Sequence, residues 1–295
     1  MSIVISPWNS KNSLVTDKDI RDIYNRAGID DDLVIHDISH YQRAFNHKSY
    51  VKSKALDNFV KKGQNKEIRL EPKTDESILD LQEHSYENYE FLGDRVLDLS
   101  IAFYIHNRFP DSDEGFKTKL KTKIVNTDSL AILANALRLG DYILLSKHVE
   151  DNCDGRTNPR ILEDVFESFI CSIFLDQNNS NINEPMNLIG QGWQIANRFI
   201  TYLIENNLDI EKMAVTDENY KDIVLRYYQH TFGITPKYIE IDIYGPPNNR
   251  IFTVGILDKY GAIVGEGVAK SKKKAEQIAS KNALIHYGQL EIPVS

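Results

Sequence analysis

The sequence is poor in cysteine, in long apolar runs and in net positive charge. Its 295 residues include only two cysteines, Cys153 and Cys171, which are too few for a disulfide framework and fit a reducing compartment. No apolar run approaches the roughly 20 residues that a membrane-spanning helix needs. Residues 1–15 lack the basic and apolar regions of a signal peptide. We therefore expect an intracellular protein, cytoplasmic or nuclear and not secreted, with no membrane partner.

The net charge of −8 excludes a chain that is basic throughout, but the charge is unevenly distributed. Residues 219–288 contain ten Lys and Arg against six Asp and Glu, a net charge of +4, which leaves −12 for the remainder. A basic C-terminal part favours contact with nucleic acid there. The length predicts one to three domains, and hydrophobic residues make up 41% of the chain, enough for real cores.

Residues 86–105 are predicted to form a helix, because they lack proline and remain apolar to the end. Glu87, Glu90 and Asp94 have the i, i+3, i+7 spacing of one helix face, and Asp98 extends that stripe. The rest of the helix is apolar nearly all round, which predicts burial. Buried carboxylates repel one another and need a positive partner, such as a divalent metal. The spacing alone equally fits a solvated acidic stripe.

A second acidic pair follows in residues 161–170. Asp164 and Glu167 have i, i+3 spacing and lie on the narrow polar face of a helix that is otherwise apolar. Two helices that each offer carboxylates could meet around Mg²⁺, a hard cation that prefers oxygen ligands. Acidic pairs on amphipathic helices are common, so this pattern is weak by itself.

Four segments together resemble the ribonuclease III family. Residues 88–97 (NYEFLGDRVL) are similar to its signature, and residues 160–168 (RILEDVFES) to its second acidic motif. Residues 43–50 (RAFNHKSY) resemble its opening helix and residues 124–131 (IVNTDSLA) its middle helix. Four motifs in the family's order and spacing make a specific match.

This resemblance implies an endoribonuclease that cleaves double-stranded RNA in RNA processing or degradation. It implies hydrolysis with two Mg²⁺ ions, for which Mn²⁺ can substitute, to 5′-phosphate and 3′-hydroxyl ends with short 3′ overhangs. Glu90, Asp94, Asp164 and Glu167 match the family's metal ligands, and Glu87 is expected to support the catalytic site from its edge. The family works as a homodimer whose signature helices pack together. The interface residues predicted from this are Phe91, Leu92 and Val96.

Residues 219–288 change to the order α-β-β-β-α and resemble a double-stranded RNA-binding domain. Strands are predicted over 238–244, 251–257 and 262–265, with helices before and after them. The stretch from Gly265 through Glu276 matches that domain's final-helix motif, with lysines at a helix start where the helix dipole favours phosphate. Asn248 stands where the domain usually has a minor-groove His. The predicted RNA-binding residues are Lys270, Lys272, Lys273, Lys274 and Asn248. A protein-binding role for this module is the alternative.

The predicted fold class is therefore an all-α ribonuclease III domain followed by a small α+β double-stranded RNA-binding domain. The expected boundaries are a flexible tail 1–15, the nuclease domain 16–212 with an exposed, partly disordered insertion at 51–82, a linker 213–218, the RNA-binding domain 219–288 and a tail 289–295.

A protein that binds duplex RNA without cutting it is the alternative to an enzyme. An RNA-masking factor or a ribosome-associated relative would behave in this way. The presence of all four expected acids favours the enzyme, since a non-cleaving descendant has little reason to keep them.

Overall fold

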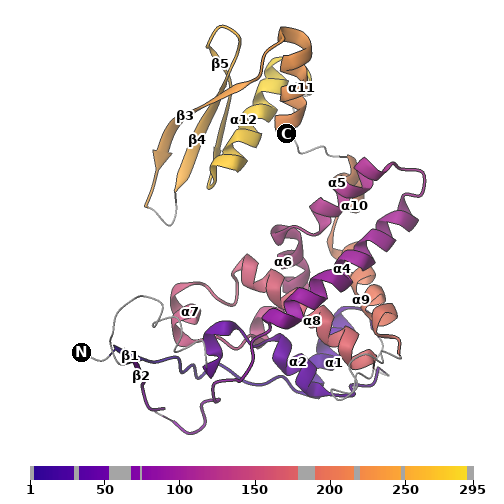
Figure 1. Ribbon diagram of the computed structural model, residues 1–295, viewed down its shortest axis with the longest axis vertical. Coiled ribbons are helices and arrows are strands. Elements are labelled where there is room, and N and C mark those ends of the chain that lie inside the picture. Colours follow the sequence, from indigo (N-terminus) through magenta and orange to yellow (C-terminus); the bar gives the residue numbers. More distant parts are fainter. Residues whose placement is uncertain are drawn as a thin grey trace. The chain divides into compact units, whose positions relative to one another are not determined.

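The computed structural model of the chain describes residues 3–29, 33–52, 68–73, 75–178, 190–215, 220–246 and 250–290. The chain divides into two compact units, Met1–Met213 and Ala214–Ser295, which are coloured indigo to orange and orange to yellow in Figure 1. Each unit is described by itself. The division lies at the predicted linker.

The first unit is mainly helical and is built around one pair of long helices. This pair, α4 (Glu87–Arg108) and α8 (Pro159–Gln177), forms the most extensive contact between any two of its elements (Figure 1). The remaining elements are β1 (Ile3–Ile5), α1 (Asp17–Arg26), α2 (Ile38–Ala44), the 3-10 helix η1 (Lys48–Tyr50), β2 (Ile68–Leu70), α5 (Glu114–Ile124), α6 (Thr127–Ala136), the 3-10 helix η2 (Leu139–Tyr142), α7 (Lys147–Asn152), α9 (Gly192–Asn207) and α10 (Ile210–Val215).

Helix α8 starts where the sequence marks a helix start and forms the centre of the core. Asn158 caps the helix by accepting a hydrogen bond from the Arg160 amide at 3.1 Å, and proline follows at the first helical position. Phe169 of α8 then contacts four buried aromatic rings at centroid distances of 5.7–6.3 Å. These rings are Tyr24, Tyr41, Phe45 and Phe199. Aromatic pairs of this kind each contribute about 0.5–1.5 kcal/mol beyond area burial.

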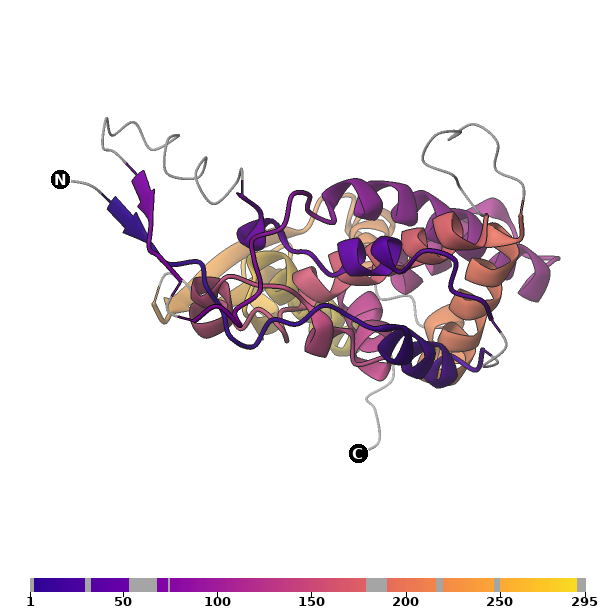
Figure 2. The same ribbon diagram turned by 90° about the horizontal axis from the view of Figure 1, so that it is seen from below.

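The first 15 residues do not form the loose tail that the sequence suggested. Strand β1 pairs in parallel with β2, and the chain then runs along the first unit (Figure 2). Asn9 and Asn12 are nearly fully buried, and both donate to the carbonyl oxygen of Leu145 at 3.0 and 2.9 Å. Two side-chain amides here supply the hydrogen bonds of a backbone carbonyl that is distant in the sequence. Because such contacts do not repeat with a helix or strand period, the sequence pattern does not reveal them.

The second half of the predicted 51–82 insertion packs against the domain in part: Leu81 is buried, while Glu71, Pro72 and residues 75–77 are exposed. Residues 53–67 and 74 lie outside the described residues. Beyond them the Tyr50 hydroxyl donates to the Leu79 carbonyl at 2.6 Å. A buried cluster joins this half to the rest of the unit: Tyr50, Leu81 and Leu144.

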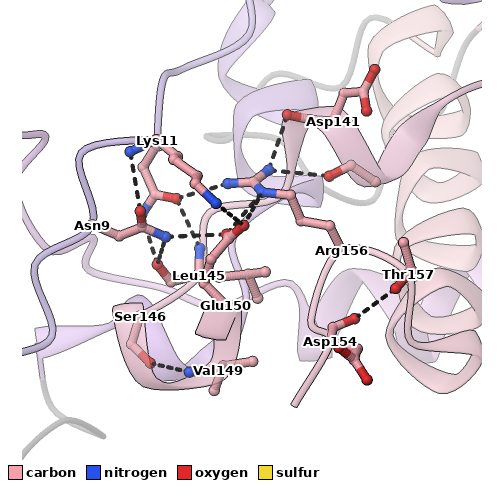
Figure 3. Close-up of polar contacts among 12 residues, drawn as sticks. Asn9, Lys11, Asp141, Leu145, Ser146, Val149, Glu150, Asp154, Arg156 and Thr157 are labelled. Carbon is pink, nitrogen blue, oxygen red and sulfur yellow. Dashed lines mark hydrogen bonds and ion pairs between the residues drawn. The ribbon is translucent and has the colours of Figure 1, made fainter. Parts of the chain in front are cut away.

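A polar network fastens the N-terminal segment to the loop that precedes α8 (Figure 3). The Arg156 Nε donates to both carboxylate oxygens of Glu150 at 3.1 and 2.8 Å. Its Nη1 donates to the carbonyl oxygens of Gly140 and Asp141 at 3.1 and 3.0 Å, and its Nη2 to Asn12 Oδ1 at 3.3 Å. The Glu150 side chain is only 8% exposed. One guanidinium group therefore joins three separate segments.

Removing one partner of this network is expected to destabilise the first unit. Glu150→Gln leaves a mostly buried guanidinium without its counter-charge and should lower the free energy of unfolding by about 2–3 kcal/mol. Asp141→Asn is the matched control, because its carboxylate forms a more exposed pair with Arg138 at 2.6 Å, worth less than about 1 kcal/mol. Both tryptophans of the chain lie in this unit, so tryptophan fluorescence in urea follows its unfolding. Equal midpoints for the two variants would contradict this role of the network.

The second unit has the predicted α-β-β-β-α order. Its elements are α11 (Tyr220–Phe232), β3 (Lys237–Tyr244), β4 (Ile251–Leu257), β5 (Ile263–Ala269) and α12 (Lys272–His286), with an antiparallel sheet in the order β3-β4-β5. Helix α12 lies close against β5, because a Cβ at Gly265 would come within 2.3 Å of the Ala279 carbonyl oxygen. The module has its own buried core: Val224, Tyr228, Ile256, Ala279, Ala283 and Leu284.

Within the parts of the chain that the structure describes, no helix has both the length and the apolarity that crossing a membrane requires.

Candidate active site and nucleic-acid interface

Helices α4 and α8 meet backbone to backbone at Gly93. A Cβ atom at this position would lie 1.8 Å from the carbonyl oxygen of Glu167, so only glycine permits this approach. Glu90 and Asp94 flank Gly93 on α4, while Asp164 lies one turn before Glu167 on α8. The glycine inside the first acidic motif thus brings the two predicted acidic pairs to one helix crossing.

The carboxyl groups at this crossing raise one another's pKa values. Burial raises the pKa of Glu167 to about 9, and the negative charges of Asp94 and Glu163 add to the rise. Burial and the charge of Asp164 raise the pKa of Glu90 to about 7. The pKa of Asp164 is also raised, mainly by burial. Without a bound cation, the cluster therefore holds protons near neutral pH.

Three carboxylates of the acidic stripe have positive partners. Asp94 forms an ion pair with the adjacent Arg95. Glu87 faces the Lys48 ammonium group at 3.6 Å. Asp98 accepts a hydrogen bond from Lys121 at 2.9 Å and is part of an ion pair that joins α4 to α5. The sequence pattern did not separate Asp98 from the other acids, because its lysine comes from a different helix.

The donor set at the crossing fits a hard divalent cation. The pKa values of Glu90, Asp164 and Glu167 are raised, and a positive charge between these carboxylates would lower them again. Among the described residues, no three His, Cys, Asp or Glu side chains are yet arranged as a metal-binding group. Binding would have to draw the carboxylates together.

The three predicted interface residues differ in exposure. Phe91 is 72% exposed, Leu92 is half-buried, and Val96 is only 6% exposed and belongs to the core. Val96 therefore cannot present its side chain to a partner, because at this point of α4 it faces inward. Leu99, two turns further along α4, is another exposed apolar residue of this helix, at 56%.

The predicted RNA-binding lysines lie at the start of α12. Ser271 caps this helix by accepting a hydrogen bond from the Lys274 amide at 3.3 Å. Lys270, Lys272, Lys273 and Lys274 are all exposed at this positive helix end. Asn248, the fifth predicted RNA-binding residue, lies outside the described residues.

Sequence reasoning overlooked several side chains that shape these sites. Tyr86, 1% exposed, donates its hydroxyl hydrogen to Asp164 at 3.2 Å. Glu163 lies beside the acidic cluster, and burial raises its pKa. Glu240 forms an ion pair with Lys272 at 2.7 Å. Tyr86 adjoins the signature and Glu163 precedes the second acidic pair, so their positions in the sequence could have indicated that both belong near the site. Glu240 had no such indication, because 32 residues separate it from its partner.

Two protein families match this chain in the regions just described. The family described as "Ribonuclease-III-like" matches residues 37–189, which include all four predicted metal ligands. The family described as "Double-stranded RNA binding motif" matches residues 220–287, which include the lysines of α12.

Similar proteins cover most of the chain. "Probable ribonuclease 3" of Acanthamoeba polyphaga mimivirus is 32% identical over 283 residues, 96% of this chain and 48% of that protein. The chain thus spans about half the length of that relative. "Ribonuclease 3" of Campylobacter jejuni is 33% identical over 207 residues, 70% of this chain and 85% of that protein. "Ribonuclease 3" of Pelotomaculum thermopropionicum is 34% identical over 196 residues, 66% of this chain and 75% of that protein.

Proposed function

Since the chain belongs to the ribonuclease III family of endoribonucleases and carries a double-stranded RNA binding motif, we propose that it hydrolyses double-stranded RNA with Mg²⁺. The observation that carries this proposal is the crossing at Gly93, which gathers four carboxylates on two helices. We propose products with 5′-phosphate and 3′-hydroxyl ends and short 3′ overhangs, as the resemblance to the family implies.

Glu90, Asp94, Asp164 and Glu167 would hold the metal, directly or through water. When bound, Mg²⁺ supplies an activated water and neutralises the charge that develops on the leaving oxygen. In the absence of metal, Glu90 and Glu167 hold protons because their pKa values are raised. Binding of the cation near neutral pH would therefore displace a proton. The Tyr86 hydroxyl orients the Asp164 carboxylate, and Lys48 keeps Glu87 at the edge.

We further propose that two copies pair through the exposed face of α4. Phe91 and Leu99 present apolar side chains to water there, and exposed patches of this kind mark interfaces. A two-fold axis repeats the same patch on both copies. The two acidic sites would then be related by symmetry, and each would cut one strand of a single duplex.

The direct test is incubation of a long RNA duplex with purified full-length protein, with Mg²⁺ and with a chelator. We expect short duplex products with Mg²⁺ and intact RNA with chelator, resolved on native and denaturing gels. Mapping of the product ends checks the 5′-phosphates and the overhangs. Binding without cleavage in every metal condition would reject the enzyme in favour of the duplex binder.

Removal of the second unit is expected to make cleavage depend steeply on salt. A fragment ending at Met213 retains the contact of Lys123 Nζ with the Met213 carbonyl at 2.7 Å and should keep its fold. It should cleave at low salt but lose most cleavage at physiological salt, because it lacks the phosphate contacts of the α12 lysines. Filter binding across a salt titration measures the difference. Equal affinities of fragment and full chain at all salt concentrations would contradict this role for the second unit.

A further inference from the structure

The three consecutive lysines at the start of α12 are not equivalent. Lys272 Nζ lies 2.7 Å from Glu240 Oε1, and the two side chains are 51% and 41% exposed. For Lys273 and Lys274, no side-chain ion pair is found in the part of the chain that the structure describes. One of the three positive charges is therefore already neutralised by the protein itself.

The position of Glu240 in the sheet places it on the face that α12 covers, within ion-pair distance of Lys272. Glu240 pairs in register with Val254, which is completely buried, so both side chains are on the face of the sheet that α12 covers. The preceding residue on that face, Tyr238, shares a hydrogen bond with Ser280 of α12 at 2.6 Å. Since β3 is hydrogen-bonded to β4, the backbone of Glu240 is held beside α12, next to the register irregularity between Glu240 and Asp242.

Glu240 thus occupies, in the free protein, a place that suits a phosphate. Its charge lies beside a lysine and at the positive end of a 15-residue helix, where an anion is favoured by the helix dipole. We propose that Glu240 is an internal competitor of RNA: it holds Lys272 in the free protein and weakens duplex binding. This inference rests on the proposed binding of duplex RNA by the α12 lysines.

Two physical effects make Glu240 unfavourable for binding. Lys272 must exchange its carboxylate for a phosphate, which forfeits the ion pair. The Glu240 carboxylate then stays near that phosphate and repels it. A weaker hold on duplex RNA would favour release of cleaved products, a useful property for an enzyme that must turn over.

The test compares Glu240→Gln with Asp242→Asn in the full-length protein, with chelator present to prevent cleavage. Both variants remove one negative charge from β3, but the Asp242 carboxylate accepts a hydrogen bond from the Ile243 amide rather than pairing with Lys272. We expect Glu240→Gln to bind duplex RNA about 3–10-fold more tightly than wild type at low salt. Asp242→Asn should change affinity less than twofold.

Combining these variants with Lys272→Ala separates the inference from the proposed function. We expect Lys272→Ala to weaken binding more in the Glu240→Gln background than in wild type. Lys272→Ala could weaken wild-type binding while Glu240→Gln fails to strengthen binding. In that case Glu240 positions Lys272 for RNA, and the proposal that Glu240 competes with RNA is wrong. If Glu240→Gln and Asp242→Asn strengthen binding equally, the effect is general charge and the inference also fails. Binding unaffected by Lys272→Ala, Lys273→Ala and Lys274→Ala together would refute RNA binding by these lysines itself. Thermal unfolding confirms that each variant is folded.

Discussion

Glu167→Gln is expected to abolish cleavage of duplex RNA while leaving duplex binding nearly unchanged. Glu167 lies at the backbone contact between α4 and α8 and is surrounded by the other carboxylates of the cluster. An amide keeps the size of the side chain but removes the charge that would hold a cation. We expect a loss of a hundredfold or more in cleavage rate, on the scale of other preorganised electrostatic groups. Single-turnover cleavage and filter binding measure the two quantities separately.

Asp98→Asn is the matched control for this variant. It changes the same kind of group on the same acidic stripe, but Asp98 is paired with Lys121. We expect cleavage by Asp98→Asn within a few-fold of wild type. A Glu167→Gln protein that cuts at the wild-type rate would remove Glu167 from the site, whatever the behaviour of Asp98.

The same substitution has a predictable effect on stability. The folded-state pKa of Glu167, about 9, lies above its ordinary value of 4.5. Between these values the unfolded chain releases a proton that the folded protein retains, so this group reduces stability as pH rises through that window. Without metal, Glu167→Gln should therefore be more stable than wild type at pH 8 by at least about 1 kcal/mol, and equally stable at pH 4, since one pKa unit is about 1.4 kcal/mol. Added Mg²⁺ should stabilise wild type more than the variant.

The sequence predicted which acids meet at the helix crossing because they lie in two short helical motifs, the first of which also contains Gly93. Period and spacing placed Glu90 with Asp94 and Asp164 with Glu167, and the helices formed as expected. What the sequence could not indicate was which acids have cations nearby, since Lys121 and Lys48 come from other elements. The family resemblance suggested Val96 as an interface residue, but its side chain is only 6% exposed and packs in the core.

The largest departures lie where polar side chains replace periodic packing. The N-terminal segment is held by Asn9 and Asn12, and the loop before α8 by Arg156 and Glu150. The contacts of Asn9 and Asn12 join residues more than 130 positions apart. The contact of Arg156 with Glu150 joins two residues of the same segment before α8. Neither kind produces an apolar repeat, and this is why the sequence suggested a flexible tail for residues 1–15.

Phe91→Glu is expected to separate the proposed dimer into monomers without unfolding the protomer. Because Phe91 is 72% exposed, a charge there is readily solvated in the monomer. At a two-fold contact the same charge would be buried opposite its own copy, which costs several kcal/mol. Light scattering at micromolar concentration should report about twice the 33.9 kDa chain mass for wild type and about once that mass for the variant.

Ile132→Glu is the control, because Ile132 is 48% exposed but lies on α6 rather than on the exposed face of α4. We expect this variant to remain dimeric and active, which would show that the effect belongs to the α4 face and not to any added charge.

Phe91→Glu should lose paired cleavage of both strands along with the dimer, since each copy would supply one acidic site. A wild-type protein that is monomeric and still makes paired, staggered cuts would show that the two sites are not related by a two-fold axis. A dimeric Phe91→Glu protein would place the contact elsewhere on the molecule.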